Sequence, residues 1–452
     1  MKKNILLAFI LFSFCFTSTG QNKYKELDAL LNKNSMIDAM TVLEKLKDNP
    51  KKDTLDAEYW LRYSKASFTL YKYENAKAAI DKSIKLAPQN AAYHFEKGLM
   101  LNRIGEPENA LIALQRAVEL KPKGEYHYWK GIVNQQLNKL KDAEEDYKSA
   151  LANGFETPEL HNNYTNILMI NEKFTESLIH ANKAVAMDKK NGMAYSTRSK
   201  NHLYLLNVDA ACADKSAAYD LGYMRVFQIP DTICKGSFIQ KMKFAGDYCA
   251  GSNMYKQAIK AYSALIDKKE YQSDIFLNRG YCYYKLKEYA NAEKDYLKAL
   301  ELPNPVKDLL YDNLSLLYFD QDNYTKSIEY SSKRIELNPK NHVPYIDRGL
   351  NYRKLKKYDE AEKDFNKSLS IKPDFFRAYG YRAFLFLELG QYRQSLEDAS
   401  KSVEINPKYA YGYLVLAQAK QKLGQTDFCT DLLNAQKYGN DEADIAIKQY
   451  CN

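Results

Sequence analysis

The sequence has 452 residues and a formal net charge of +9 at pH 7, from 66 Lys and Arg against 57 Asp and Glu. A chain of this length exceeds one compact core, so several domains or a repeat array are expected. Basic and acidic residues are interspersed and no basic block occurs, which argues against a nucleic-acid partner.

The segment over 1–20 has the pattern of an export signal. Lys2 and Lys3 precede an uncharged apolar run over 5–16, and small residues follow at Ser18 and Gly20. The run is too short to span a bilayer, which takes about 20 apolar residues, and no later segment is apolar enough for a membrane helix. We expect cleavage after Gly20, which would lower the net charge from +9 to +7, and a periplasmic or secreted protein.

The rest of the chain repeats itself with a period of about 34 residues, a length typical of stacked repeat units. KLKEYANAEKDYLKALEL over 285–302 returns as KLKKYDEAEKDFNKSLSI over 354–371, two periods later. Pro339, Pro373 and Pro407 follow one another at the same regular spacing. A fixed period of this length indicates a stack of similar supersecondary units.

Each unit has the pattern of two helices, which we call helix A and helix B. In the unit over 91–122, helix A is AAYHFEKGLMLNRIG with Gly98 inside it, and helix B is ENALIALQRAVEL. Pro107 suits the first position of helix B, and Pro122 ends it. A glycine inside a helix costs about 1 kcal/mol, so close packing of the two helices must compensate.

These features resemble the tetratricopeptide repeat, whose pattern has a Trp and a Gly in helix A, an aromatic residue in helix B and a terminal Pro. Trp60 stands at the tryptophan position. The helix-A glycine is present in five units as Gly98, Gly131, Gly246, Gly280 and Gly349. The helix-B aromatic position holds Tyr147, Tyr262, Tyr296 and Phe365. The resemblance covers nearly all of the chain that follows Gly20.

The resemblance implies an all-α solenoid of about eleven to twelve helix-turn-helix repeats in two blocks. We expect a signal peptide over 1–20, a degenerate N-terminal repeat over 21–56 and a first block over 57–238. The phase slips between Gly222 and Gly246, so a second block is expected over 239–452, ending in a capping helix.

The sequence offers no catalytic motif and no metal site. Phosphate-binding, metalloprotease, serine-hydrolase and C-x-x-C signatures are absent, so we expect no enzyme activity and no cofactor. His94, His127 and His161 fall at equivalent points of successive repeats. Neighbouring helices lie about 8–10 Å apart, too far for ring nitrogens that would need to lie about 2 Å from one zinc ion. We interpret them as packing residues.

The resemblance also implies which residues face a partner, because helix A builds the concave surface of this family. The implied partner-binding positions lie in the second block: Tyr281, Tyr284, Lys285, Leu316, Phe319, Arg353, Lys354 and Phe384. Aromatic and basic side chains are enriched at binding surfaces. Whether these side chains bind a partner or simply line the solenoid remains open from the sequence.

Two cysteine pairs share one spacing. Cys212 is followed by Cys234, and Cys429 is followed by Cys451 at the same separation along the chain. Each first cysteine lies in helix B of the last repeat of a block, and each second one in the following segment, where a terminal repeat needs a cap. We predict the disulfides Cys212–Cys234 and Cys429–Cys451, and free thiols at Cys249 and Cys282.

The sequence therefore predicts a non-catalytic scaffold of the cell envelope that binds protein or peptide ligands through a concave groove. Two other functions stay open. One is a non-catalytic subunit or regulator of an envelope enzyme complex, and the other is a luminal adaptor resembling a co-chaperone. The identity of the partner is not encoded in any motif.

Overall fold

The computed structural model describes residues 24–33, 35–47, 55–225 and 228–451, and these ranges form 26 helices and no strand. The predicted all-α class is therefore confirmed. The signal peptide predicted over 1–20 and the cleavage point after Gly20 lie outside the described residues. None of the helices in these ranges is long and apolar enough to cross a membrane.

The chain divides into two compact units, which are described separately. Unit 1 comprises 1–198 and 217–226, and unit 2 comprises 199–216 and 227–452. The division passes through α12 (Gly192–Tyr204) and α13 (Val208–Asp220). The residue bounds expected for the sequence domains stay predictions.

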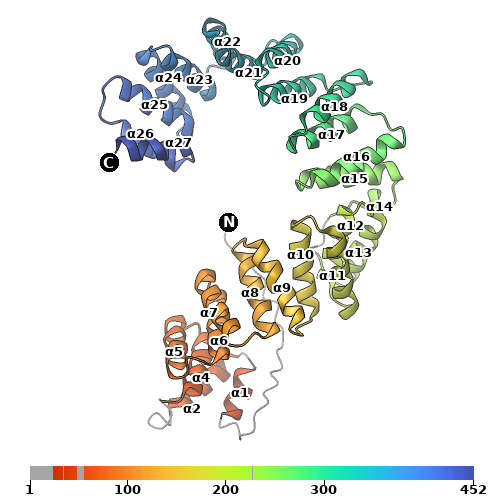
Figure 1. Ribbon diagram of the computed structural model, residues 1–452, viewed down its shortest axis with the longest axis vertical. Coiled ribbons are helices and arrows are strands. Elements are labelled where there is room, and N and C mark those ends of the chain that lie inside the picture. Colours follow the sequence, from red (N-terminus) through yellow and green to blue (C-terminus); the bar gives the residue numbers. More distant parts are fainter. Residues whose placement is uncertain (1–23, 34, 48–54, 226–227, 452) are drawn as a thin grey trace. The chain divides into compact units, whose positions relative to one another are not determined.

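The helices of unit 1 follow one another as antiparallel pairs joined by short turns (Figure 1). They are α1 (Lys25–Leu31), α2 (Met36–Lys47), α4 (Ala57–Thr69), α5 (Tyr73–Leu86), α6 (Ala91–Arg103), α7 (Pro107–Leu120), α8 (Gly124–Gln136), α9 (Leu140–Ala152), α10 (Pro158–Ile170) and α11 (Phe174–Met187). The pair α6 and α7 is the unit inferred from the sequence over 91–122, and Pro107 occupies the first turn of α7 as expected.

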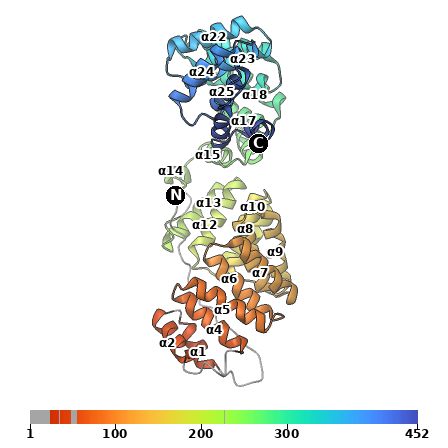
Figure 2. The same cartoon turned by 90° about the vertical axis from the view of Figure 1, so that its left-hand side faces the viewer.

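Unit 2 continues the same pairing, and Figure 2 shows its helices from a second side. After the short α14 (Asp231–Cys234) come α15 (Phe238–Gly251), α16 (Tyr255–Asp267), α17 (Ser273–Lys285), α18 (Tyr289–Glu301), α19 (Lys307–Phe319), α20 (Tyr324–Leu337), α21 (Val343–Lys354), α22 (Tyr358–Ile371), α23 (Phe376–Glu388), α24 (Tyr392–Ile405), α25 (Ala410–Lys422), α26 (Phe428–Lys437) and α27 (Asp441–Tyr450).

Helices A and B pack closely because a small residue on helix A faces a large ring on helix B. A Cβ atom added to Gly280 would lie 2.8 Å from Tyr296 Cδ1, and one added to Gly349 would lie 2.7 Å from Phe365 Cε1. Where Ser315 replaces the glycine, Ser331 replaces the aromatic residue, and their hydroxyl oxygens lie 2.8 Å apart. The glycines therefore make room for buried rings, which explains a residue that would otherwise weaken a helix.

In each of the eleven helix pairs from α4–α5 to α25–α26, the turn between helices A and B has one residue with a left-handed backbone. Most of these residues are not glycine, as the series Tyr71, Gly105, Asn138, Glu172, Leu206, Asn253, Lys287, Asp322, Lys356, Gly390 and Gly424 shows. A side chain in this conformation costs about 1–2 kcal/mol. The sequence did not reveal these turns outside the glycine positions, because Glu, Leu or Lys gives no turn signal.

Both predicted cysteine pairs lie at bonding distance. The sulfur atoms are 2.07 Å apart in Cys212–Cys234 and 2.10 Å apart in Cys429–Cys451, with Cα–Cα distances of 5.7 Å. The first pair ties α13 to α14, and the second ties α26 to the residue after α27. Within unit 2, Lys215 adds to the first tie, since its Nζ donates to the carbonyl of Ile229 and to Asp231, both at 2.7 Å.

The other two cysteines of the described residues, Cys249 and Cys282, are free and buried. Burial raises the pKa of each thiol to about 12. A thiol with so high a pKa is almost never in the reactive thiolate form near neutral pH. Their surroundings fit the packing role expected from the sequence.

Candidate peptide-binding face

The eight partner-binding residues predicted from the sequence all lie on helices A of unit 2. They come from α17 (Tyr281, Tyr284, Lys285), α19 (Leu316, Phe319), α21 (Arg353, Lys354) and α23 (Phe384). Among the helices A of this unit, α17 contacts α15 and α19, and α21 contacts α23. We call the surface formed by these eight residues the A-helix face.

Two large apolar side chains of the A-helix face are open to solvent. Tyr281 is 40% exposed and Leu316 is 44% exposed. Lys285 lies over the Tyr281 ring with its Nζ 5.8 Å from the ring centre, and Tyr255 packs edge-on against the other part of the ring. A ring held in place by its neighbours loses little conformational freedom when a ligand covers it.

Arg353 and Phe384 contact each other across neighbouring repeats. The Arg353 guanidinium lies 4.8 Å from the centre of the Phe384 ring, a cation–π distance. Arg353 also donates to Glu388 at 2.9 Å. Its charge is therefore already partnered inside the chain, so a ligand carboxylate would have to compete with Glu388.

Tyr284 is likewise engaged, because its hydroxyl donates to Asp320 on the next helix A at 2.6 Å. Burial, and then the Asp320 carboxylate, raises the pKa of this hydroxyl. Phe319 packs edge-on against Tyr324 within its own repeat. The sequence-based set thus contains both exposed side chains (Tyr281, Lys285, Leu316 and Lys354) and side chains that join the repeats (Tyr284, Phe319, Arg353 and Phe384).

A series of Arg–Asp pairs links helices A and B in three repeats of unit 2. Arg279 pairs with Asp295, Arg348 with Asp364 and Arg382 with Asp398, each through two hydrogen bonds of 2.6–2.8 Å. The Asp follows its Arg at the same spacing in all three pairs, a regularity that is visible in the sequence and that our interpretation of it missed. Buried forked pairs of this kind fix the geometry of neighbouring elements.

Three carboxylates share one guanidinium between α19, α20 and α21. Arg334 donates to Asp308 at 3.2 Å, to Asp347 at 3.0 Å and also to Asp312. Burial raises the pKa of Asp347 to about 6, against the lowering effect of Arg334. One arginine cannot neutralise three acids, so this cluster keeps an acidic character.

His161 has the packing role expected from the sequence, and it also contacts a second histidine, His180. His161 is fully buried and its Nδ1 lies 2.9 Å from Nδ1 of His180, while its Nε2 lies 2.9 Å from Glu156. The sequence interpretation missed His180, because it lies on helix B and outside the repeating series. Within the described ranges no three His, Cys, Asp or Glu side chains are grouped to hold a metal ion.

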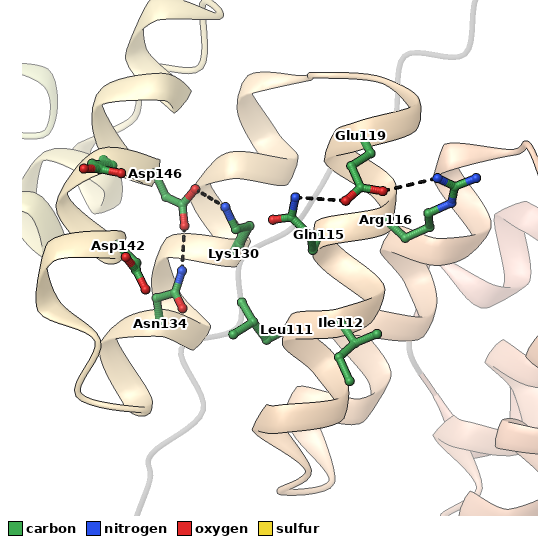
Figure 3. Close-up of a pocket in the computed structure, with 10 residues that line it drawn as sticks. Leu111, Ile112, Gln115, Arg116, Glu119, Lys130, Asn134, Asp142 and Asp146 are labelled. Carbon is green, nitrogen blue, oxygen red and sulfur yellow. Dashed lines mark hydrogen bonds and ion pairs between the residues drawn. The ribbon is translucent and has the colours of Figure 1, made fainter.

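A pocket of about 570 Å³ lies in unit 1 among α7, α8 and α9 (Figure 3). Leu111 and Ile112 line it from α7, Lys130 and Asn134 from α8, and Asp146 from α9. Its volume is in the range of small-ligand pockets. No pattern in the sequence indicates this pocket, because its walls come from three helices with ordinary surface residues.

Four segments of the chain match sequence models of a known protein family. Residues 68–125, 273–302, 310–341 and 344–375 match the tetratricopeptide repeat. The chain contains tetratricopeptide repeats. Several of these matched segments contain helix pairs and Gly–aromatic contacts that are described above.

Relatives and solved structures of similar form are known. Human sperm-associated antigen 1 is 31% identical over 98 residues, which are 22% of this chain and only 10% of that protein. The crystal structure of MamA is 16% identical, covers 38% of this chain and 98% of its own, and has a TM-score of 0.35. Yeast Tom70 is 14% identical, with 87% and 95% coverage and a TM-score of 0.38. These likenesses identify no partner for this chain.

Proposed function

We propose that this chain is a non-catalytic scaffold that binds protein or peptide ligands through the A-helix face of unit 2. One observation carries the proposal: Tyr281 and Leu316, on successive helices A, expose large apolar side chains beside basic residues. Tyrosine is enriched among the side chains that supply most of the binding energy of an interface, and an exposed leucine adds apolar area that a ligand can bury. A tetratricopeptide array supplies the extended surface on which such side chains can act together.

The compartment is part of the proposal. The signal-like pattern over 1–20 supports export to the cell envelope, and the two cysteine pairs at bonding distance support an oxidising compartment. The scaffold would then work in the periplasm or outside the cell.

The test begins with peptides selected for binding to the full chain from a random peptide library. The double variant Tyr281→Ala/Leu316→Ala should weaken the selected peptides about tenfold or more, since loss of a central side chain at an interface costs about 1–2 kcal/mol. The matched control is Tyr271→Ala/Leu297→Ala. It removes a tyrosine that is 52% exposed and a leucine that is 37% exposed, neither of which lies on a helix A.

The control should change affinity by less than twofold. Equal weakening by both double variants, or none by the first, would move the binding surface elsewhere. Circular dichroism of each variant checks that the helical content is unchanged.

A further inference from the structure

The polar side chains that line the pocket among α7, α8 and α9 differ in whether they already have a partner. Its donor-bearing side chains each contact an acid: Lys130 Nζ lies 2.7 Å from Asp146, Arg116 lies 3.2 Å from Glu119, and Gln115 donates to the same Glu119 at 3.1 Å. Figure 3 shows these contacts as dashed lines. The two basic charges of the pocket are therefore balanced by Glu119 and Asp146.

Two carboxylates of the pocket, in contrast, have no partner among the described residues. Asp142 and Glu145 are exposed, and their side chains make no hydrogen bond or ion pair with any residue of the described ranges. The lining residues carry two basic groups, Arg116 and Lys130, against four acidic ones, Glu119, Asp142, Glu145 and Asp146, a net charge of −2. The surplus charge attracts a cation.

Asn134 provides an independent sign that a donor is missing. It is only 2% exposed, and its Nδ2 donates to Asp146 at 2.8 Å, but its Oδ1 has no partner. In Figure 3 the side chains of Asn134 and Asp142 are drawn next to each other, and the amide oxygen of Asn134 is directed away from Asp146. A buried acceptor without a donor costs about 1–3 kcal/mol, and a donor inserted past Asp142 would relieve that cost.

The apolar part of the pocket suits the stem of a long side chain. Ile112 is 69% exposed at the rim, and Leu111 is half-buried beside it. Lysine and arginine side chains place their methylene groups on apolar surface and keep a charged head among polar groups.

We propose that this pocket binds a lysine or arginine side chain of a partner protein. The cationic head lies between Asp142 and Glu145 and donates to Asn134 Oδ1, and the stem packs on Leu111 and Ile112. The site belongs to unit 1, so it is separate from the A-helix face of unit 2 and goes beyond the function proposed above.

The experiment measures binding of acetyl-tetraarginine amide to the full chain by isothermal titration calorimetry at low salt. Acetyl-tetracitrulline amide is the neutral peptide of the same shape. The double variant Asp142→Asn/Glu145→Gln removes the two free charges and keeps the side-chain shapes. Its matched control, Asp359→Asn/Glu360→Gln, removes two exposed acids from the first turn of α22, which is also a helix B.

We expect tetraarginine to bind and tetracitrulline to bind at least tenfold more weakly. The variant at 142 and 145 should weaken tetraarginine at least fivefold, and the control less than twofold. Equal effects of the two double variants would show unspecific attraction and overturn the proposal, as would unchanged binding by the first. Tighter binding of spermidine than of tetraarginine would make the occupant a free polyamine and would also overturn it.

Discussion

The glycine of helix A allows a direct test of the packing between the two helices of a repeat. In Gly280→Ala, the new Cβ would lie 2.8 Å from Cδ1 and Cε1 of Tyr296 and 3.2 Å from Cβ of Asp295. Ordinary carbon contacts are about 3.5–4.0 Å. Neither neighbour can retreat easily, because Tyr296 is fully buried and Asp295 is held by Arg279.

Two effects of this substitution oppose each other. Alanine is favoured over glycine in a helix by about 1 kcal/mol, whereas overpacking a buried contact costs about 1–3 kcal/mol. The matched control is Gly251→Ala at the end of α15, where an added Cβ meets nothing within 4 Å. The free energy of unfolding of Gly280→Ala should therefore lie about 1–3 kcal/mol below that of Gly251→Ala.

The assay is urea unfolding of both variants, followed by circular dichroism, with the slopes compared as well as the midpoints. A second arm repeats Gly280→Ala in a Tyr296→Ala background, where the closest contacts are gone and the penalty should shrink to the part that Asp295 causes. A Gly280→Ala variant as stable as Gly251→Ala, or a penalty of the same size without the ring, would exclude this packing effect.

Three further predictions concern turns, charge and crosslinks. Lys287→Gly should stabilise the protein by about 1 kcal/mol in the same urea assay, because an exposed lysine there holds a left-handed backbone; a loss of stability would contradict this. Burial, and then the neighbouring His161, lowers the pKa of His180 to about 4, whereas the unfolded value is about 6.5. The unfolded chain takes up this proton at a higher pH than the folded chain, so the free energy of unfolding has its full value above pH 6.5 and falls as the pH decreases towards 4. Over that range, wild type should lose about 1–2 kcal/mol more of this free energy than His180→Gln. Parallel pH profiles of the two proteins would argue against it. Cys429→Ser/Cys451→Ser should lower stability by about 3 kcal/mol if the crosslink forms, and peptide mapping of the non-reduced protein should recover it; freely alkylated thiols at both positions would exclude it.

The sequence predicts the repeats well because their signals are local. Small residues, prolines and apolar spacing recur within each unit, so the helix pair α6 and α7 follows from 91–122 alone. The cysteine pairs also follow from local spacing at the end of each predicted block. Each of these features depends on residues within about one repeat.

The features that the sequence did not reveal depend on neighbours that no local pattern specifies. Arg353 meets Glu388 on the next helix A, and His161 meets His180 on the other helix of its repeat. The pocket is formed by three helices, so the pocket and the missing donor of Asn134 become apparent only in the folded structure. For this reason the sequence could assign residues to the A-helix face but could not say which of them are already occupied.

Site-specific photo-crosslinking in cells that express the protein can show whether the A-helix face of unit 2 binds a protein partner. A benzophenone amino acid is placed at position 281 on α17 and, in a matched protein, at position 297 on α18. We expect a discrete cross-linked species from position 281, lost when Leu316→Ala is added, and none from position 297. Equal cross-linking from both positions, or only from position 297, would contradict it.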